Sequence, residues 1–201
     1  HAVQVAMPPV SAAFARLWPE AETVNLLDDS LSVDRGSAPA LSPAMSDRIA
    51  RLGAYARDLG ADGVLYTCSA FGPAIEAIAR SATWPVLKPN EAMFEAALAK
   101  GRRIGMIASF PRSVPSMEAE FRELARARGI DATIRSVCEP RAMPALQAGD
   151  AQTHNRLLAE IAPRLADCDA ILLAQFSTSV AADAVQAAVP CPVLTSPASA
   201  V

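Results

Sequence analysis

The sequence predicts an α/β fold with two pseudosymmetric lobes, each a mostly parallel sheet flanked by helices, and an active site in the cleft between them. Two observations give the class. Short aliphatic runs alternate with longer helical patterns along all 201 residues, as in βαβ proteins. The runs are also continuously apolar, which is typical of strands buried on both faces of a parallel sheet. A third observation, an internal repeat, gives the two lobes.

The strands are predicted where β-branched or aliphatic residues cluster between Gly, Pro and polar positions. Each run is short, as expected for strands rather than helices. We expect strands at residues 3–6, 24–27, 63–67, 104–108, 132–137, 170–174 and 193–195.

The helices are predicted from apolar residues at helical spacing. Between residues 41 and 60, for example, Ile49, Leu52 and Ala56 fall on one helical face, and Gly60 provides a stop signal. The same reasoning predicts further helices at residues 10–18, 73–80, 91–99, 114–128, 151–166 and 180–188.

The repeat aligns residues 61–68 with residues 168–175 and runs without a gap to the Pro-Val-Leu of residues 85–87, which aligns with residues 192–194. A weaker echo places Met7-Pro8 over Phe110-Pro111. Chance similarity between two strand-turn-helix units is the alternative explanation. The ungapped length favours a true duplication and therefore two similar lobes.

The lobes are expected to face each other across a ligand-binding cleft. We assign residues 1–92 together with residues 193–201 to the first lobe, and residues 93–192 to the second.

Composition excludes several classes of function. The net charge of -3, with no Lys/Arg stripe, argues against nucleic-acid binding. No apolar run reaches the roughly 18 residues that cross a bilayer, so no membrane partner is expected. Four widely spaced cysteines and two histidines predict no metal site, and the dinucleotide and P-loop motifs are absent, so no cofactor is expected. We expect a cytoplasmic protein with reduced thiols, and native residues before His1.

The candidate site lies at the carboxyl ends of the strands, where parallel α/β proteins bind ligands. The repeat places Cys68 and Gln175 at equivalent strand ends. A helix N-terminus lowers the pKa of a thiol, which would make Cys68 a base or nucleophile, whereas an isolated buried cysteine is usually only a small apolar residue. Gln175 cannot exchange protons, but its amide can orient a carboxylate.

Neighbouring residues complete the prediction. Substrate contacts are expected from Ser69, Ala70, Ser109, Phe176, Ser177 and Thr178. Ser177 and Thr178 would otherwise serve as helix caps. Arg112 either pairs with a carboxylate or is exposed.

Other polar and thiol groups are expected to have structural roles. Asp28 and Asp29 suit a turn, and His154 is expected on a helix surface. The remaining cysteines are interpreted as structural: Cys138, Cys168 and Cys191.

The chain resembles the aspartate/glutamate/hydantoin racemase superfamily, which includes arylmalonate decarboxylases and maleate isomerases. The resemblance rests on four stretches: Leu-Tyr-Thr-Cys-Ser at 65–69, Leu-Leu-Ala-Gln at 172–175, Met-Pro-Pro at 7–9 and Ser-Pro-Ala at 196–198. It implies an active site between two lobes, with Pro8 beside it, and cofactor-independent proton chemistry at the carbon next to a carboxylate. Two opposed cysteines carry that chemistry in the family's racemases.

This chain departs from the racemase pattern at several positions. It has only the first cysteine, Cys68, and carries Gln175 at the second position. Glutamate racemases have an acid and a serine where this chain has Pro8-Pro9, and Asn-Thr where it has Ser69-Ala70. The decarboxylase branch keeps its cysteine in the second half, so the proton donor here would approach from the opposite face.

These features predict a small-carboxylate enzyme that forms an enolate-like intermediate, with Cys68 transferring a proton and Gln175 orienting the substrate. The alternatives are decarboxylation of a malonate-like acid and a non-catalytic carboxylate-binding protein. A homo-oligomer is expected.

Overall fold

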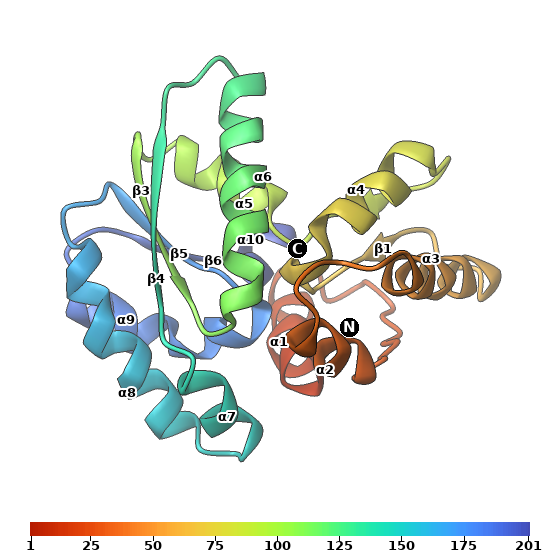
Figure 1. Cartoon of the computed structure of the whole chain (residues 1–201), viewed down its shortest axis with the longest axis horizontal. Helices are drawn as coiled ribbons and strands as arrows, with labels where there is room; N and C mark the ends of the chain where they lie inside the picture. Colours follow the sequence, from red (N-terminus) through yellow and green to blue (C-terminus); the bar gives the residue numbers. More distant parts are fainter.

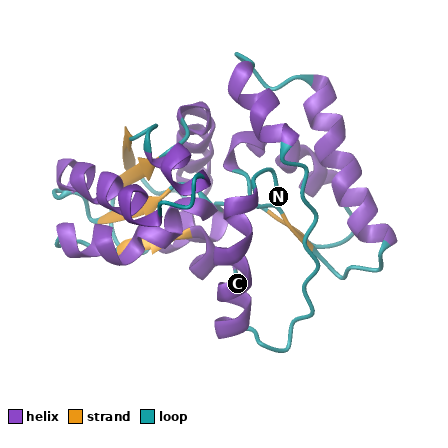
Figure 2. Ribbon diagram, turned by 90° about the horizontal axis from the view of Figure 1, so that it is seen from below, coloured by secondary structure: helices purple, strands orange, loops and turns teal.

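The computed structural model describes residues 1–201 and contains two parallel sheets that lie side by side, each covered by helices (Figures 1 and 2). This confirms the predicted α/β class. The first sheet has two strands, β1 and β2, and the second has four, in the order β4-β3-β5-β6. The helices and strands are α1 (Met7–Leu17), α2 (Ser30–Ser37), α3 (Pro43–Asp58), β1 (Val64–Leu65), α4 (Gly72–Ser81), β2 (Val86–Leu87), α5 (Glu91–Leu98), β3 (Arg103–Ala108), α6 (Val114–Ala127), β4 (Thr133–Cys138), α7 (Ala142–Gln147), α8 (Ala151–Ile161), β5 (Ala170–Leu173), α9 (Ala182–Ala188), β6 (Val193–Thr195) and α10 (Ser196–Ala200).

Short 3-10 turns connect several strands to the helices that follow them. They are η1 (Gln4–Ala6), η2 (Ser69–Phe71), η3 (Pro111–Ser113), η4 (Ala162–Leu165) and η5 (Phe176–Ala181). Two of these turns, η2 and η3, contribute residues to the walls of the candidate site described below.

The central strands of the second sheet, β3 and β5, are buried on both faces, as their apolar sequences predict. Side chains alternate along β5: Ala170 and Leu172 join the core formed with α5 and α6, whereas Ile171 and Leu173 join the core formed with α8 and α9. Figure 1 shows these two helix pairs on opposite sides of the sheet. Burying each large aliphatic side chain contributes about 1.5–3 kcal/mol to the stability of this sheet.

The first sheet is smaller and relies on helices for most of its burial. Ile49 of α3 and Ile75 of α4 pack in one core with Tyr66, which follows β1. On the other side, Leu65 packs against a small cluster that contains Val10 of α1 and Phe176 of η5. Contacts between α1 and η5 thus join the two lobes.

The sequence repeat is also a repeat of strand pairing. The two edges match residue for residue, with Val64 beside Val86 and Leu65 beside Leu87 in the first sheet, and Ile171 beside Val193 and Leu172 beside Leu194 in the second. These are the positions that the sequence alignment equates. Each repeat then continues from its first strand into a 3-10 turn and a helix.

The weaker sequence similarity, which placed Met7-Pro8 over Phe110-Pro111, aligns at a different position in the structure. In the structure η1 leads into α1 as η3 leads into α6, so Met7-Pro8 corresponds to Val114-Pro115 rather than to Phe110-Pro111. Pro8 and Pro115 both stand in the first turn of their helices, where a missing N–H leaves no bond unmade.

Two predicted strands do not form. Residues 3–6 contain the 3-10 turn η1 directly before α1, and residues 24–27 have no strand beside them. The second segment is tied only to His1, whose amino group donates to the Leu26 carbonyl at 2.8 Å and whose carbonyl accepts from Asp28 N–H at 3.1 Å. Apolar runs become strands only where a neighbouring strand completes the ladder, and Val24 instead remains 77% exposed.

The chain end lies on the second sheet, because β6 pairs with β5. This pairing differs from the predicted assignment of residues 193–201 to the first lobe, since a strand belongs with the sheet whose ladder it completes. The helix α10 contacts α5 of the second lobe and also α1 of the first. The other bounds of the two lobes remain a prediction.

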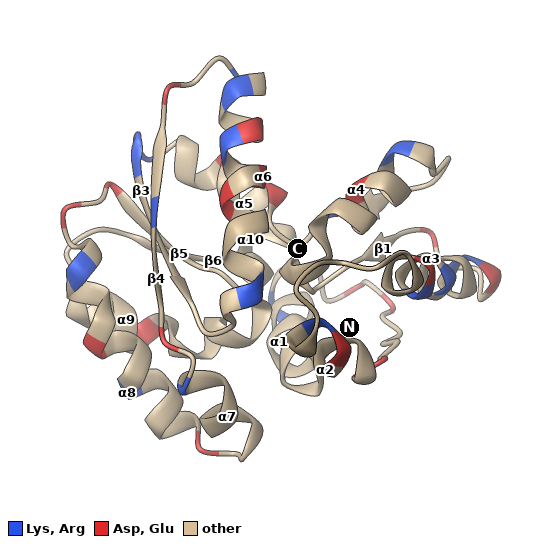
Figure 3. Cartoon of the chain, viewed as in Figure 1, with Lys and Arg blue, Asp and Glu red and all other residues tan.

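Figure 3 shows Lys and Arg interspersed with Asp and Glu along α3 and α6. None of the helices combines the length and the apolar character needed to span a bilayer.

Asp169 lies directly before β5, and its carboxylate binds the backbone at the start of β3. We predict that this contact makes the stability of the fold depend on pH. The Asp169 carboxylate accepts from the N–H groups of Arg102 and Arg103 at 2.8 and 2.9 Å, which holds its pKa at about 2. A lowered pKa in the folded state stabilises the fold above the unfolded value of 3.8, and this stabilisation disappears as the pH falls toward 2.

Thermal unfolding across that pH range checks the prediction. Asp169→Asn should lower the unfolding temperature at neutral pH and flatten its decline below pH 4. Asp62→Asn is the matched control, because Asp62 is the exposed counterpart of Asp169 in the repeat. Equal acid sensitivity of wild type and Asp169→Asn would contradict the assignment.

Candidate active site

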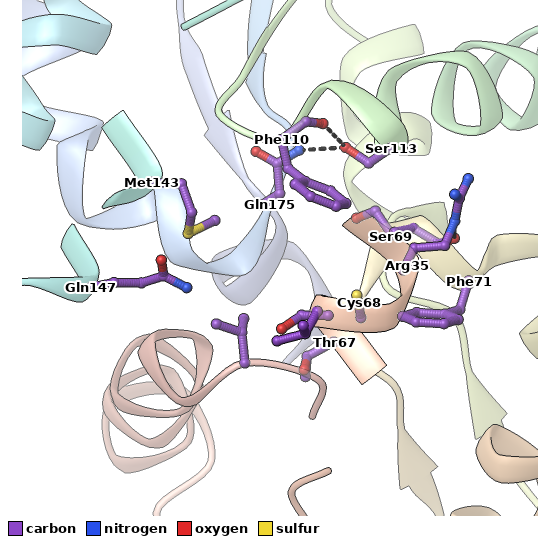
Figure 4. A pocket seen from close by; sticks show the side chains of 14 residues that line it. Arg35, Thr67, Cys68, Ser69, Phe71, Phe110, Ser113, Met143, Gln147 and Gln175 are labelled. Atoms are coloured by element: carbon purple, nitrogen blue, oxygen red, sulfur yellow. Dashed lines mark hydrogen bonds between the residues drawn. The ribbon is translucent and has the colours of Figure 1, made fainter. Parts of the chain in front are cut away.

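A cavity of about 230 Å³ lies where the turns after the strands of the two lobes meet (Figure 4). Its walls come from η2 and η3, from helices α2 and α7, and from the residues at the ends of β1 and β5. The lining residues are Val3, Ser32, Val33, Arg35, Thr67, Cys68, Ser69, Ala70, Phe71, Phe110, Ser113, Met143, Gln147 and Gln175.

Cys68 lines the cavity at the N-cap of η2. Burial raises the pKa of its thiol to about 11, and the Ala70 N–H and the Arg35 guanidinium offset only part of that effect. The expected lowering of this pKa by a helix N-terminus is therefore wrong. The physical reason is that η2 is a three-residue turn, whose dipole is small, while desolvation of the thiolate is large. At neutral pH Cys68 is a thiol and holds a proton to donate.

Gln175 lines the same cavity from the second lobe, and its side-chain amide is hydrogen-bonded to other residues of that lobe. Its Oε1 accepts from the Ser109 N–H at 2.9 Å and lies 3.3 Å from the Ser109 hydroxyl, and its Nε2 donates to the Ser113 hydroxyl at 2.7 Å. Ser113 in turn donates to the Phe110 carbonyl at 2.8 Å, a chain of bonds visible in Figure 4. The amide is held in one orientation and has one N–H left for a ligand.

Ser69 and Ala70, two of the predicted contact residues, line the cavity, and Ser69 also joins the lobes. The Ser69 hydroxyl lies 2.9 Å from Asn90 Oδ1 and 3.1 Å from the carbonyl of Ala174. It has one proton for these two acceptors. Its hydroxyl proton is therefore engaged within the protein and does not serve a substrate oxyanion.

The other predicted contact residues do not line the cavity. Pro8 is exposed on α1, and Phe176 packs into the small apolar cluster between the lobes. The Thr178 hydroxyl accepts from the Gln175 N–H at 3.2 Å, which is the capping alternative, and donates to the Gln175 carbonyl at 2.7 Å. Ser109 acts through Gln175, and Ser177 is buried away from the cavity.

Arg35 is the main residue that sequence reasoning missed. It is 8% exposed, lies on α2, which was not predicted, and donates to the carbonyls of Ala70, Ala38 and Arg112 at 3.3, 3.1 and 3.5 Å. No carboxylate neutralises it, and no acidic side chain lines the cavity. The side chain of Arg112 is exposed, so only its carbonyl takes part. The cavity wall therefore carries one buried cation and no acidic side chain.

The expectation that His154 lies on a helix surface is wrong. His154 is fully buried, because its face of α8 packs toward the core formed with α8 and α9. Its Nδ1 lies 2.8 Å from Asn155 Oδ1, and its Nε2 has no partner. The ring of His1 lies 2.8 Å from the Thr67 hydroxyl, directly before Cys68. No three metal-binding side chains come together.

These features define a two-lobed α/β protein whose duplicated strand-turn units meet at one cavity, with a thiol on one side and an amide on the other. Residues 9–201 match the Asp/Glu/Hydantoin racemase family model, and the chain belongs to that family. The resemblance drawn from the sequence is thereby confirmed. No curated protein matches the chain by sequence.

Solved structures show the same fold. A glutamate racemase from Bacillus anthracis has a TM-score of 0.80 at 14% identity, covering 98% of this chain and 75% of that one. Allantoin racemase from Klebsiella pneumoniae gives 0.71 at 18%, with 98% and 80% covered, and an arylmalonate decarboxylase gives 0.62 at 18%, with 94% and 82% covered. At such identities the likeness shows the fold and not the activity.

Proposed function

We propose that this protein transfers a proton at the carbon next to the carboxylate of a small acid, without a cofactor, and that Cys68 carries the proton. The observation that carries the proposal is the position of the Cys68 thiol on a cavity built from the duplicated strand ends of a racemase-family chain.

The cavity walls support the substrate class. A volume of about 230 Å³ suits a small acid, and the buried guanidinium of Arg35 favours an anion. Much of the remaining wall is apolar, with Val33, Phe110 and Met143 among its residues. We therefore expect a carboxylate with an apolar substituent rather than a second charged group.

Gln175 is proposed to orient the substrate through its remaining N–H. Cys68 then acts on the face of the α carbon opposite to that amide. The developing enolate oxygens are stabilised by the field of Arg35 and by the Gln175 N–H, in place of the hydroxyl groups predicted from the sequence.

Decarboxylation of a malonate-like acid is the second candidate, and the protonated state of Cys68 favours it. The bond between the α carbon and the departing carboxylate breaks, and carbon dioxide leaves. The electron pair of that bond stays with the α carbon, which becomes part of an enediolate. Cys68 donates its proton to that carbon, and water reprotonates the thiolate. Racemisation or isomerisation requires Cys68 to start as a thiolate, which its raised pKa disfavours at neutral pH.

The test is α-proton exchange or decarboxylation in deuterated water, followed by NMR over a panel of small carboxylic and malonic acids. We expect at least one acid with an apolar substituent to react. Saturable binding of such acids with no exchange and no loss of carbon dioxide would overturn the proposal and favour a non-catalytic carboxylate-binding protein.

Arg35 provides a second prediction. Arg35→Met removes the positive charge and should raise the KM or Kd for the acid by about tenfold, the effect of losing about 1.4 kcal/mol. Arg35→Lys keeps the charge and should bind the acid more tightly than Arg35→Met. The exposed Arg112→Met is the control, and affinities are measured by titration calorimetry. Unchanged affinity in Arg35→Met would remove Arg35 from substrate recognition.

A further inference from the structure

Behind the thiol side of the cavity lies a buried polar network that the proposed reaction does not use. Asn90 is completely buried between the lobes. Its Nδ2 donates to Glu120 Oε2 of α6 at 2.9 Å, and its Oδ1 accepts from the Ser69 hydroxyl at 2.9 Å. Ser116 of α6 adds a longer contact to the Ser69 carbonyl at 3.4 Å.

The orientation of Asn90 is unusual for its place in the fold. It occupies the N-cap of α5, where an asparagine side chain ordinarily accepts from the first free N–H groups of the helix. Asn90 makes no such bond and points its amide toward Ser69 and Glu120 instead. Helix capping therefore does not explain its presence.

The network exists on one side of the repeat only. The position equivalent to Ser69 is Phe176, which packs with Ala6 and Val10 in an apolar cluster. A serine hydroxyl held by a buried asparagine is thus found beside the thiol, at the turn η2 that follows Cys68, and has no counterpart at the equivalent turn η5.

We propose that Asn90 and Glu120 are positioning residues for Cys68: they clamp Ser69, and with it η2, against the second lobe. This inference rests on the proposed function for its kinetic consequence. Glu120 holds Asn90 in the orientation that presents Oδ1 to Ser69, and the Ser69 hydroxyl links η2 to the end of β5 through Ala174. With η2 fixed, the Ala70 N–H and the thiol keep their places on the cavity wall.

The kinetic test compares Glu120→Ala, Asn90→Ala and Glu120→Gln. The alanine variants should lower kcat by about tenfold, as a small misplacement of a reacting group does, with KM changed by less than about twofold. Glu120→Gln should restore the wild-type kcat, because its amide oxygen also accepts from Asn90. Glu123→Gln is the matched control, since Glu123 is exposed on the same helix.

A second readout needs no substrate, so it tests the positioning role of Asn90 and Glu120 even if the proposed function is wrong. Alkylation of Cys68 by iodoacetamide, followed by peptide mass spectrometry, reports how open η2 is, and thermal unfolding shows that each variant is folded. The alanine variants should label at least about threefold faster, because a loosened turn exposes the thiol and relieves its desolvation. Glu120→Gln and Glu123→Gln should label at the wild-type rate. Wild-type labelling in both alanine variants would overturn the inference even if the protein proves to be an enzyme.

Discussion

Replacement of Cys68 by alanine is expected to lower the rate of proton transfer by about 10²–10⁴-fold, the usual contribution of a positioned general acid or base. The reason is structural: the opposite wall offers Gln175, which exchanges no proton, and no Asp, Glu, His or Lys lines the cavity. Binding of the acid should change little, because Arg35 and Gln175 remain. Rates are measured by NMR on whichever acid the wild type turns over.

Cys138→Ala is the matched control for this loss, because Cys138 is also a partly buried thiol with a pKa raised by burial but does not line the cavity. It should react at the wild-type rate. If Cys68→Ala retained full activity, the thiol would not be the proton carrier and the proposed mechanism would be wrong.

Gln175→Cys should open the second face of the substrate to proton transfer. The repeat makes position 175 the counterpart of position 68, and the Ser109 N–H and the Ser113 hydroxyl, which now hold the amide, would be free to stabilise a thiolate. We expect exchange at the second face to rise by at least about 10²-fold, the lower range for a positioned acid or base. Chiral chromatography of the product would then show both enantiomers.

Gln175→Ser separates this effect from simple loss of the amide. Serine is similar in size to cysteine but is not a proton carrier at neutral pH, so its product should remain a single enantiomer. A Gln175→Cys variant that still yields one enantiomer at the wild-type rate would show that the two strand ends do not face one substrate.

The second lobe was largely predictable because its two central strands, β3 and β5, are continuously apolar and almost wholly buried. The pattern of β5 places every residue in a core, so its apolar run leaves little choice of structure. The first lobe was harder to predict. Its strands β1 and β2 have two residues each, and α2 has a weakly apolar sequence that only its contacts stabilise.

The pair at the centre of the site was predictable for a different reason. The repeat places Cys68 and Gln175 at equivalent strand ends without any knowledge of side-chain contacts. Residues brought in from other elements have no such signal, as Arg35 on α2 and Asn90 before α5 show. Whether a hydroxyl faces a ligand or a backbone carbonyl also depends on contacts, which is why Thr178 proved to be a cap.

The most direct test of the account is the configuration of the α carbon after reaction in deuterated water. With one thiol and an immobile amide opposite, the wild type should add deuterium at a single face and give one enantiomer of the labelled acid. Cys68→Ala should add none above the uncatalysed rate. Deuterium at both faces in the wild type, or equal labelling by Cys68→Ala, would contradict one-sided proton transfer by Cys68.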